Sequence, residues 1–386
     1  QNTRKVMEAF QDNRVSESCF AGTTGYGYDD LGRDTLDKIY AQIFGTEAAL
    51  VRIGFVNGTH ALTTAMFALA KPGDTILAVT GLPYDTLRSA IGISGDCHGS
   101  LKFYGINYGQ VDLAPDGGPD YEGIARAAAE KSVAAVMIQR SRGYGERKAL
   151  TVEEIGKICS TVKSVNPGAY IMVDNCYGEL VEYKEPGHVG ADVVVGSLMK
   201  NLGGGIASTG GYVAGREDLI AMVADRLTAP GIGKNQGANF NQNNAFFKGV
   251  FMAPNAVKGA LKTQVFASWM LEKLGYKNVA PKWNDKRTDI IQTVELGNKE
   301  NLVHFTQGIQ ESSPIDSFVR VMPAPMPGYP FDEVMACGSF TNGSTIELSA
   351  DAPVVPPYTL YMQGGLSFEY GKLSILLALT HIRETL

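Results

Sequence analysis

The run Gly190-Ala-Asp-Val-Val-Val-Gly-Ser-Leu-Met-Lys200-Asn-Leu-Gly-Gly-Gly205 joins a short β-branched segment to a serine, a lone lysine and three glycines. A second apolar run, Ile171-Met-Val-Asp174-Asn-Cys-Tyr177, stops just as abruptly at an aspartate. Apolar runs of this length, bounded by glycine, are typical of strands inside a parallel sheet. Because the carboxyl ends of parallel strands meet at one edge, Asp174 and Lys200 are expected where open α/β sheets bind ligands.

One lysine and one carboxylate at this edge form the pair of groups that pyridoxal 5′-phosphate requires. The lysine forms the Schiff base, and the acid pairs with the pyridinium nitrogen. We therefore predict that Lys200 is the catalytic amine and that Asp174 binds the cofactor. We also expect burial near cationic groups to lower the pKa of Lys200. The alternative is a surface lysine after a strand and a helix-capping aspartate, because surface lysines are common.

The composition excludes several classes of protein. The chain has 386 residues, enough for a large domain and a smaller companion. Its 44% hydrophobic and 19% charged residues are ordinary for a soluble globular protein. A formal net charge of −6 gives no basic face for nucleic acid, and no apolar run approaches the ~20 residues that span a bilayer. The five cysteines are scattered, without a C-x-x-C pair or a His/Cys cluster, so we predict no metal site and a cytoplasmic protein without a signal peptide.

Two further segments suggest cofactor contacts. Asn57-Gly58-Thr59 leads into an apolar helix, and a small turn at a helix start points N–H groups at an anion. Tyr84 follows an expected strand over Thr75–Thr80, where it could either pack in a loop or stack on a planar cation.

Other elements are assigned from periodicity and turn residues. Residues 1–34 are expected to form an irregular arm, followed by a helix over Thr35–Phe44 that Asp34 caps. We further expect helices over Val152–Val165, over Ala245–Gly275 with a break near Pro254, and from Tyr370, strands over Ala134–Gln139, Ser317–Met322 and Ser344–Ser349, and a long loop over 229–244.

Several motifs resemble one known family. Ser197-x-x-Lys200 downstream of Val-Asp-Asn-x-Tyr resembles the Cys/Met-metabolism branch of the fold-type I pyridoxal-phosphate enzymes. Over essentially the full length, the chain looks like the bacterial methionine γ-lyase family, also called aluminium-resistance-type proteins. The motifs that carry this resemblance are Tyr26-Gly-Tyr-Asp-Asp-Leu-Gly-Arg33, Thr228-Ala-Pro-Gly-Ile-Gly-Lys234, Arg287-Thr-Asp-Ile-Ile-Gln292, Ile346-Glu-Leu-Ser-Ala-Asp351 and Met362-Gln-Gly-Gly-Leu366.

The resemblance implies an α/β fold of type I, with a mostly parallel seven-stranded sheet in the large domain and a smaller C-terminal α+β domain. The expected bounds are an arm and first helix over 1–45, a large cofactor-binding domain over 46–245 and a small domain over 246–386. It also implies a homodimer or homotetramer with sites at the subunit interface.

The resemblance also implies roles for individual residues. Gly58, Thr59 and Ser197 would bind the cofactor phosphate, and Tyr84 would stack on the pyridine ring as a cofactor-binding and catalytic residue. Tyr26, Tyr28 and Arg33 would contact the cofactor phosphate of the neighbouring subunit, whereas the alternative is an arm that packs on its own domain.

Two departures from the family pattern concern substrate recognition. Related lyases carry a Glu-x-Pro-x-Asn type segment where this chain has Gln139-Arg-Ser-Arg-Gly-Tyr144, and Gln363-Gly-Gly-Leu-Ser-Phe-Glu369 lacks the usual carboxylate-binding arginine. Arg140 and Arg142 could bind the substrate carboxylate by a bidentate fork, or could lie in an exposed basic loop.

The function predicted from these observations is a pyridoxal-phosphate-dependent carbon–sulfur lyase. It would act on a sulfur amino acid of the methionine, cystathionine or cysteine type by β- or γ-elimination. The alternatives are another reaction of the same cofactor (γ-replacement, aldol cleavage or transamination) and a stress- or aluminium-related protein with little lyase activity.

Overall fold

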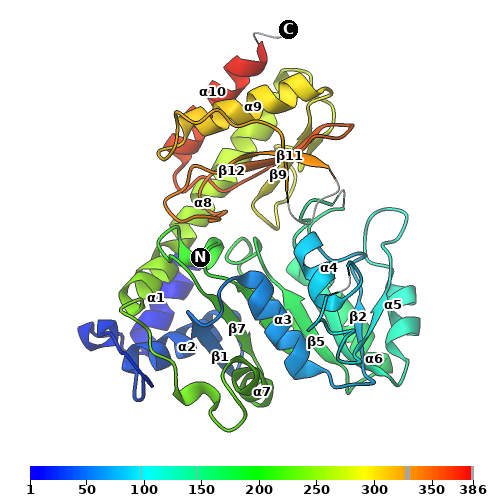
Figure 1. Cartoon of the computed structure of the whole chain (residues 1–386), viewed down its shortest axis with the longest axis vertical. Helices are drawn as coiled ribbons and strands as arrows, with labels where there is room; N and C mark the ends of the chain where they lie inside the picture. The colour runs from blue at the N-terminus through cyan, green and yellow to red at the C-terminus, as the bar shows by residue number, and fades with distance from the viewer. Residues whose placement is uncertain (96, 146, 327–330, 384–386) are drawn as a thin grey trace.

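The computed structural model describes residues 1–95, 97–145, 147–326 and 331–383. Its larger part is built on a seven-stranded sheet (Figure 1). In spatial order the strands are β1 (Ala48–Arg52), β7 (Gly211–Gly215), β6 (Val193–Ser197), β5 (Tyr170–Asp174), β4 (Val133–Gln139), β2 (Thr75–Ala78) and β3 (Asn107–Gln110). β7 runs antiparallel to both of its neighbours, and the other pairs are parallel. The predicted mostly parallel seven-stranded sheet is confirmed.

Helices cover both faces of this sheet. Alternate residues of β6 belong to different cores, since Val194 packs with one cluster and Val193 and Val195 pack with the other. On the Val194 side lie α1 (Asn2–Asp12), α2 (Leu31–Phe44), α5 (Tyr121–Ala128) and α6 (Val152–Val165), and on the other side α3 (Gly58–Leu69), α4 (Asp85–Ile91) and α7 (Glu217–Leu227). Covered faces of this kind explain the continuous β-branched runs in the sequence.

A second, antiparallel sheet lies above the first in Figure 1. Its order is β10 (Ala324–Pro325), β11 (Asp332–Ala336), β12 (Ser349–Pro353), β13 (Thr359–Gln363), β9 (Ile291–Glu295) and β8 (Val279–Ala280). α9 (Lys299–Ser312) and α10 (Phe368–Arg383) pack on its core face. The long helix α8 (Asn243–Lys273) connects the two parts, because its first half joins the large core and its second half joins the small one.

The remaining regular elements are short 3-10 turns: η1 (Glu17–Phe20), η2 (Pro186–Val189), η3 (Asn201–Gly203) and η4 (Gly233–Asn235). None of the helices in the described ranges is both long enough and apolar enough to cross a bilayer. The strands of the second sheet all follow residue 246, which agrees with the predicted order of domains, while the domain bounds themselves stay a prediction.

Five local predictions were wrong. Helix α1 occupies part of the segment expected to be irregular, and α2 begins at Leu31 because Asp30, not Asp34, accepts the N–H of Arg33 at 2.9 Å. Helix α8 continues through Pro254. Residues 317–322 are irregular, and of 344–349 only Ser349 belongs to a strand.

Candidate active site

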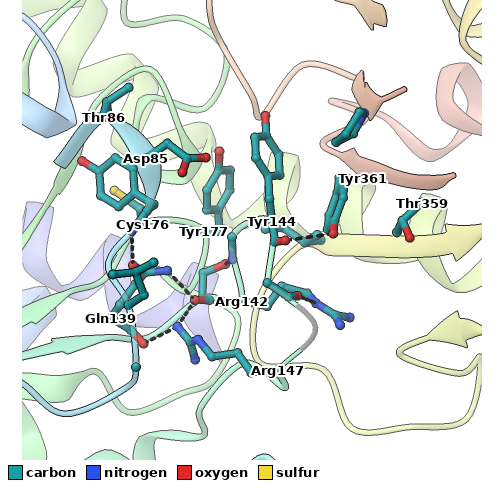
Figure 2. A pocket seen from close by; sticks show the side chains of 18 of the residues that line it. Asp85, Thr86, Gln139, Arg142, Tyr144, Arg147, Cys176, Tyr177, Thr359 and Tyr361 are labelled. Atoms are coloured by element: carbon teal, nitrogen blue, oxygen red, sulfur yellow. Dashed lines mark hydrogen bonds between the residues drawn. The ribbon is translucent and has the colours of Figure 1, made fainter. Parts of the chain in front are cut away.

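A cavity of about 800 Å³ lies between the carboxyl edge of the first sheet and the open face of the second (Figure 2). Asp174, at the end of β5, and Lys200, three residues beyond β6, both line it. The second sheet contributes side chains from β9, β11 and β13. The two parts of the chain therefore enclose one site at the edge that the sequence indicates.

Lys200 lies within a group of acidic and aromatic side chains. Its Nζ is 4.0 Å from the centroid of the Tyr177 ring, a cation–π contact. Burial alone would lower the pKa of Lys200, but the acidic groups beside it, Cys176, Tyr177 and Asp174, outweigh burial and raise this pKa well above its usual value. The expected lowering of this pKa was wrong, because the groups around the amine are acidic rather than basic.

Asp174 is 5% exposed at the bottom of the cavity. Its Oδ1 accepts the backbone N–H of Cys176 at 3.1 Å. Burial raises the pKa of this carboxyl, and Lys200 opposes that shift. A cationic group beside this buried carboxyl, such as Lys200, therefore favours its ionised form.

The start of α3 forms a close cradle beside β6. Asn57 caps the helix by accepting the N–H of His60, and Gly58 is its first residue. A Cβ at Gly58 would lie 3.2 Å from Cβ of Ser197 and 3.6 Å from Sγ of Cys176. The N–H groups at this end of α3 and the Ser197 hydroxyl thus lie together, as anion binding requires.

Tyr84 and Thr59 connect this cradle to the cavity. The Tyr84 hydroxyl is hydrogen-bonded to Oγ1 of Thr59 at 2.9 Å, and the Tyr84 backbone N–H donates to Oε1 of Gln139 at 3.2 Å. Burial, reinforced by Asp174, raises the pKa of Tyr84, so the phenol stays protonated at neutral pH. The structure therefore brings together Gly58, Thr59, Tyr84, Asp174, Ser197 and Lys200.

Arg140 and Arg142 have different surroundings. The Arg140 side chain is fully buried and bonds Glu182 at 3.1 Å, Glu185 at 3.5 Å and Oδ1 of Asn175 at 2.8 Å. These buried partners hold the guanidinium away from the cavity lining, which favours a structural role for Arg140, and its predicted contact with substrate stays a prediction. Arg142 does line the cavity, while donating to the carbonyl oxygens of Ala280 and Gly145.

The three predicted residues of the N-terminal arm also differ in their surroundings. Arg33 is 4% exposed and donates to the carbonyl oxygens of Gly27, Gly237 and Asn235 within its own chain. These bonds favour a structural role over the expected contact with a neighbouring phosphate. Tyr26 and Tyr28 are 71% and 57% exposed, and their predicted role in a neighbouring subunit stays a prediction.

Sequence reasoning missed several residues of the cavity wall. Arg147 donates from Nη2 to the carbonyl oxygens of Gln139 and Ser141, and the Tyr361 hydroxyl donates to the Tyr144 carbonyl oxygen at 2.8 Å (Figure 2). Tyr177 has a positive φ of 70°, a strained backbone that is common at functional sites. The missed lining residues are Gln139, Tyr144, Arg147, Cys176, Tyr177, Glu333 and Tyr361.

The described residues fit pyridoxal 5′-phosphate. A half-buried lysine and a buried carboxylate share one cavity, and a tight cradle that begins at Gly58 lies beside them at a helix N-terminus. Within the described ranges, no three His, Cys, Asp or Glu side chains are grouped so that they could hold a metal ion.

Comparisons with known proteins agree with this site. The chain is 46% identical over 384 residues to the uncharacterized protein YnbB of Bacillus subtilis (strain 168), covering 99% of this chain and 91% of that protein. A carbon–sulfur lyase involved in aluminum resistance from Clostridium novyi NT has a crystal structure with a TM-score of 0.95 and 48% identity, covering 99% and 90% of the two chains.

A more distant structure has the same fold. The pyridoxal-5′-phosphate dependent protein YhfS from Escherichia coli superposes with a TM-score of 0.67 at 17% identity, over 100% of this chain and 96% of that one. The fold is therefore that of the fold-type I pyridoxal-phosphate enzymes. The family model for methionine gamma-lyase matches residues 1–383, and the chain belongs to that family.

Proposed function

We propose that this protein is a pyridoxal-phosphate-dependent carbon–sulfur lyase that releases a thiol, ammonia and a 2-oxo acid from a sulfur amino acid. The observation that carries the proposal is the placement of Lys200 and Asp174 in one cavity, beside the cradle at Gly58. Membership of the methionine gamma-lyase family supports the choice of reaction class.

Each chain residue has a separate task in this proposal. The N–H groups of Gly58 and Thr59, together with the Ser197 hydroxyl, would hold the phosphate. The Asp174 carboxylate would pair with the pyridinium nitrogen, and the Tyr84 ring would cover the cofactor ring. When bound, the cofactor supplies an electron sink for the negative charge that develops at the substrate Cα.

Lys200 moves the proton. Its Nζ, once neutral, takes the proton from Cα and delivers it further along the substrate. The acidic surroundings of Lys200 favour its charged form, so neutralisation of these groups by the bound cofactor and substrate would release the amine as a base. Arg142 and Arg147 line the same cavity and would hold the substrate carboxylate.

A panel of amino acids tests the reaction class. L-cystathionine, L-methionine and L-cysteine are added to the purified holoenzyme, and thiol, ammonia and 2-oxo acid are measured in parallel. Equal amounts of all three products support elimination. A 2-oxo acid without thiol would instead indicate transamination, and thiol exchange without ammonia would indicate γ-replacement. A cofactor spectrum that no amino acid disturbs would contradict the proposal.

The active form would be a homo-oligomer with the exposed Tyr26 and Tyr28 directed at a second copy. Their exposed fractions of 71% and 57% leave large aromatic surfaces uncovered in the single chain. Light scattering on the eluted peak of a sizing column measures the mass, and a fully active monomer would contradict this arrangement.

A further inference from the structure

Glu333 occupies the wall of the cavity opposite the cofactor-binding edge. It lies on β11, where it pairs with Pro353 of β12. Side chains alternate along a strand, and Val334 and Ala352 belong to the core of the second sheet. Glu333, Pro353, Thr359 and Tyr361 are therefore on the other face of the sheet, and all of them line the cavity.

One carboxyl oxygen of Glu333 lacks a hydrogen-bond donor among the described residues. The residue is 3% exposed, and its Oε1 is buried without a hydrogen-bond donor from any described residue. Its acidic neighbours are satisfied, because Asp85 pairs with Arg88 at 2.6 Å and Asp351 accepts Nε2 of Gln363 at 2.8 Å. A buried carboxyl oxygen without a donor costs free energy, so such a group in a binding cavity indicates a donor that arrives with the ligand.

The two sheets contribute different charged side chains to the cavity. On the side of the first sheet, Lys200, Arg142 and Arg147 line it together with Asp174 and Asp85, whereas Glu333 is the charged residue that the second sheet contributes among the described lining residues. An amino acid held by its α-carboxylate on the basic side would direct its sulfur substituent away from that side. A positive charge or strong N–H donor on this substituent matches the acidic wall.

We propose that Glu333 binds a protonated amine carried by the thiol portion of the substrate, so that the enzyme prefers thioethers with an amine-bearing leaving group over plain alkyl thioethers such as methionine. This inference rests on the proposed lyase function and specifies its substrate class. Glu333 is a specificity-determining residue here, because it contacts the leaving group and not the bond that breaks.

The titration of Glu333 supports this role. Burial, with smaller contributions from Asp351 on β12 and Asp85 on α4, raises the pKa of Glu333 to about 7. Arg88 of α4 also lines the cavity, and it already pairs with Asp85. An alkyl ammonium, with an ordinary pKa of about 10.4, stays charged across this range. The preference for the amine should therefore grow as the pH rises through 7 and Glu333 ionises.

The experiment compares two substrates of matched size. S-(2-aminoethyl)-L-cysteine and S-propyl-L-cysteine differ in an ammonium in place of a methyl group, and the two homocysteine analogues form a second pair for γ-elimination. For each, kcat/KM for 2-oxo acid release is measured on the holoenzyme, and the dissociation constant is measured from the change in the cofactor spectrum. The variants are Glu333→Gln and, as control, Asp332→Asn, whose side chain is exposed on the same strand.

We expect wild type and Asp332→Asn to prefer the aminoethyl substrate by at least about tenfold, the effect of a charge-assisted hydrogen bond. Glu333→Gln should lose this preference, because its kcat/KM for the aminoethyl substrate should fall much further than its kcat/KM for the propyl substrate. Equal losses on both substrates would indicate a general role in the reaction and overturn the proposal, as would an unchanged preference in Glu333→Gln. If neither substrate releases a 2-oxo acid, the lyase proposal fails, and the two dissociation constants still decide whether Glu333 selects the amine.

Discussion

Replacing Arg140 with methionine should destabilise the fold and leave the chemistry of the site intact. The guanidinium is fully buried and neutralises Glu185, whose side chain is 0% exposed, and Glu182, which is 15% exposed. Methionine keeps much of the volume but removes the charge. Breaking one partner out of a buried ion pair costs about 3–5 kcal/mol, because the remaining charge is uncompensated. Lys5 lies 3.6 Å from Glu185 and still offsets part of its charge. We therefore expect the free energy of unfolding to fall by about 3 kcal/mol, the lower end of this range.

Urea unfolding of Arg140→Met, followed by circular dichroism, measures this loss as the midpoint shift multiplied by the slope m. The control is Arg4→Met, because Arg4 and Glu8 form an exposed pair at 2.7 Å with side chains 83% and 46% exposed. Such surface pairs contribute about 0–1 kcal/mol. Folded Arg140→Met should keep the wild-type KM for its substrate. If it unfolded like wild type but had a greatly raised KM, Arg140 would bind substrate and the structural reasoning would be refuted.

Three further predictions concern the cavity and its surroundings. Gly58→Ala should weaken binding of pyridoxal phosphate at least about tenfold, because its Cβ would crowd Ser197 at 3.2 Å; equilibrium dialysis measures this, and unchanged affinity would argue against the cradle. Arg142→Gln should raise KM more than it lowers kcat, whereas an unchanged KM would exclude a carboxylate contact. Burial raises the pKa of Glu179 from 4.5 to about 8. Between pH 4.5 and about 8 the folded protein therefore holds a proton that the unfolded chain has lost, so the free energy of unfolding falls as the pH rises through this range. Glu179→Gln should lack this fall in urea titrations at pH 5 and 8, and an equal fall would contradict the assignment.

Strands β2, β4, β5 and β6 of the first sheet were predictable because they are covered on both faces. Burial on both sides requires a continuous apolar run, and the end of each run places Asp174 and Lys200 at one edge without further information. Helix α6 was predicted with its observed bounds because Thr151 and Glu154 form a capping box at its start.

The small domain and half of the cavity were not predictable in this way. β12 carries Ser349, Asp351 and Pro353, which have low strand propensity but pair across the sheet. Glu333 and Tyr361 reach the site only because tertiary packing brings the second sheet over the first. No local pattern in the sequence marks a residue whose role depends on such a contact.

The break expected at Pro254 also failed for a tertiary reason. Proline removes one hydrogen bond from a helix, yet Ala253, Pro254 and Val257 are buried against neighbouring elements. Packing along both sides of α8 therefore compensates for the missing bond.

The most direct test of the central claim compares wild type with Lys200→Ala, both loaded with pyridoxal phosphate, and uses Lys299→Ala as a control at an exposed lysine. Thiol and 2-oxo acid are measured together from the amino acid that wild type processes best. We expect equal amounts of both products from wild type and Lys299→Ala, and a loss of about 10²–10⁴-fold in Lys200→Ala, the usual contribution of a positioned acid–base group. Thiol and 2-oxo acid released by Lys200→Ala at the wild-type rate would contradict the placement of the chemistry at Lys200.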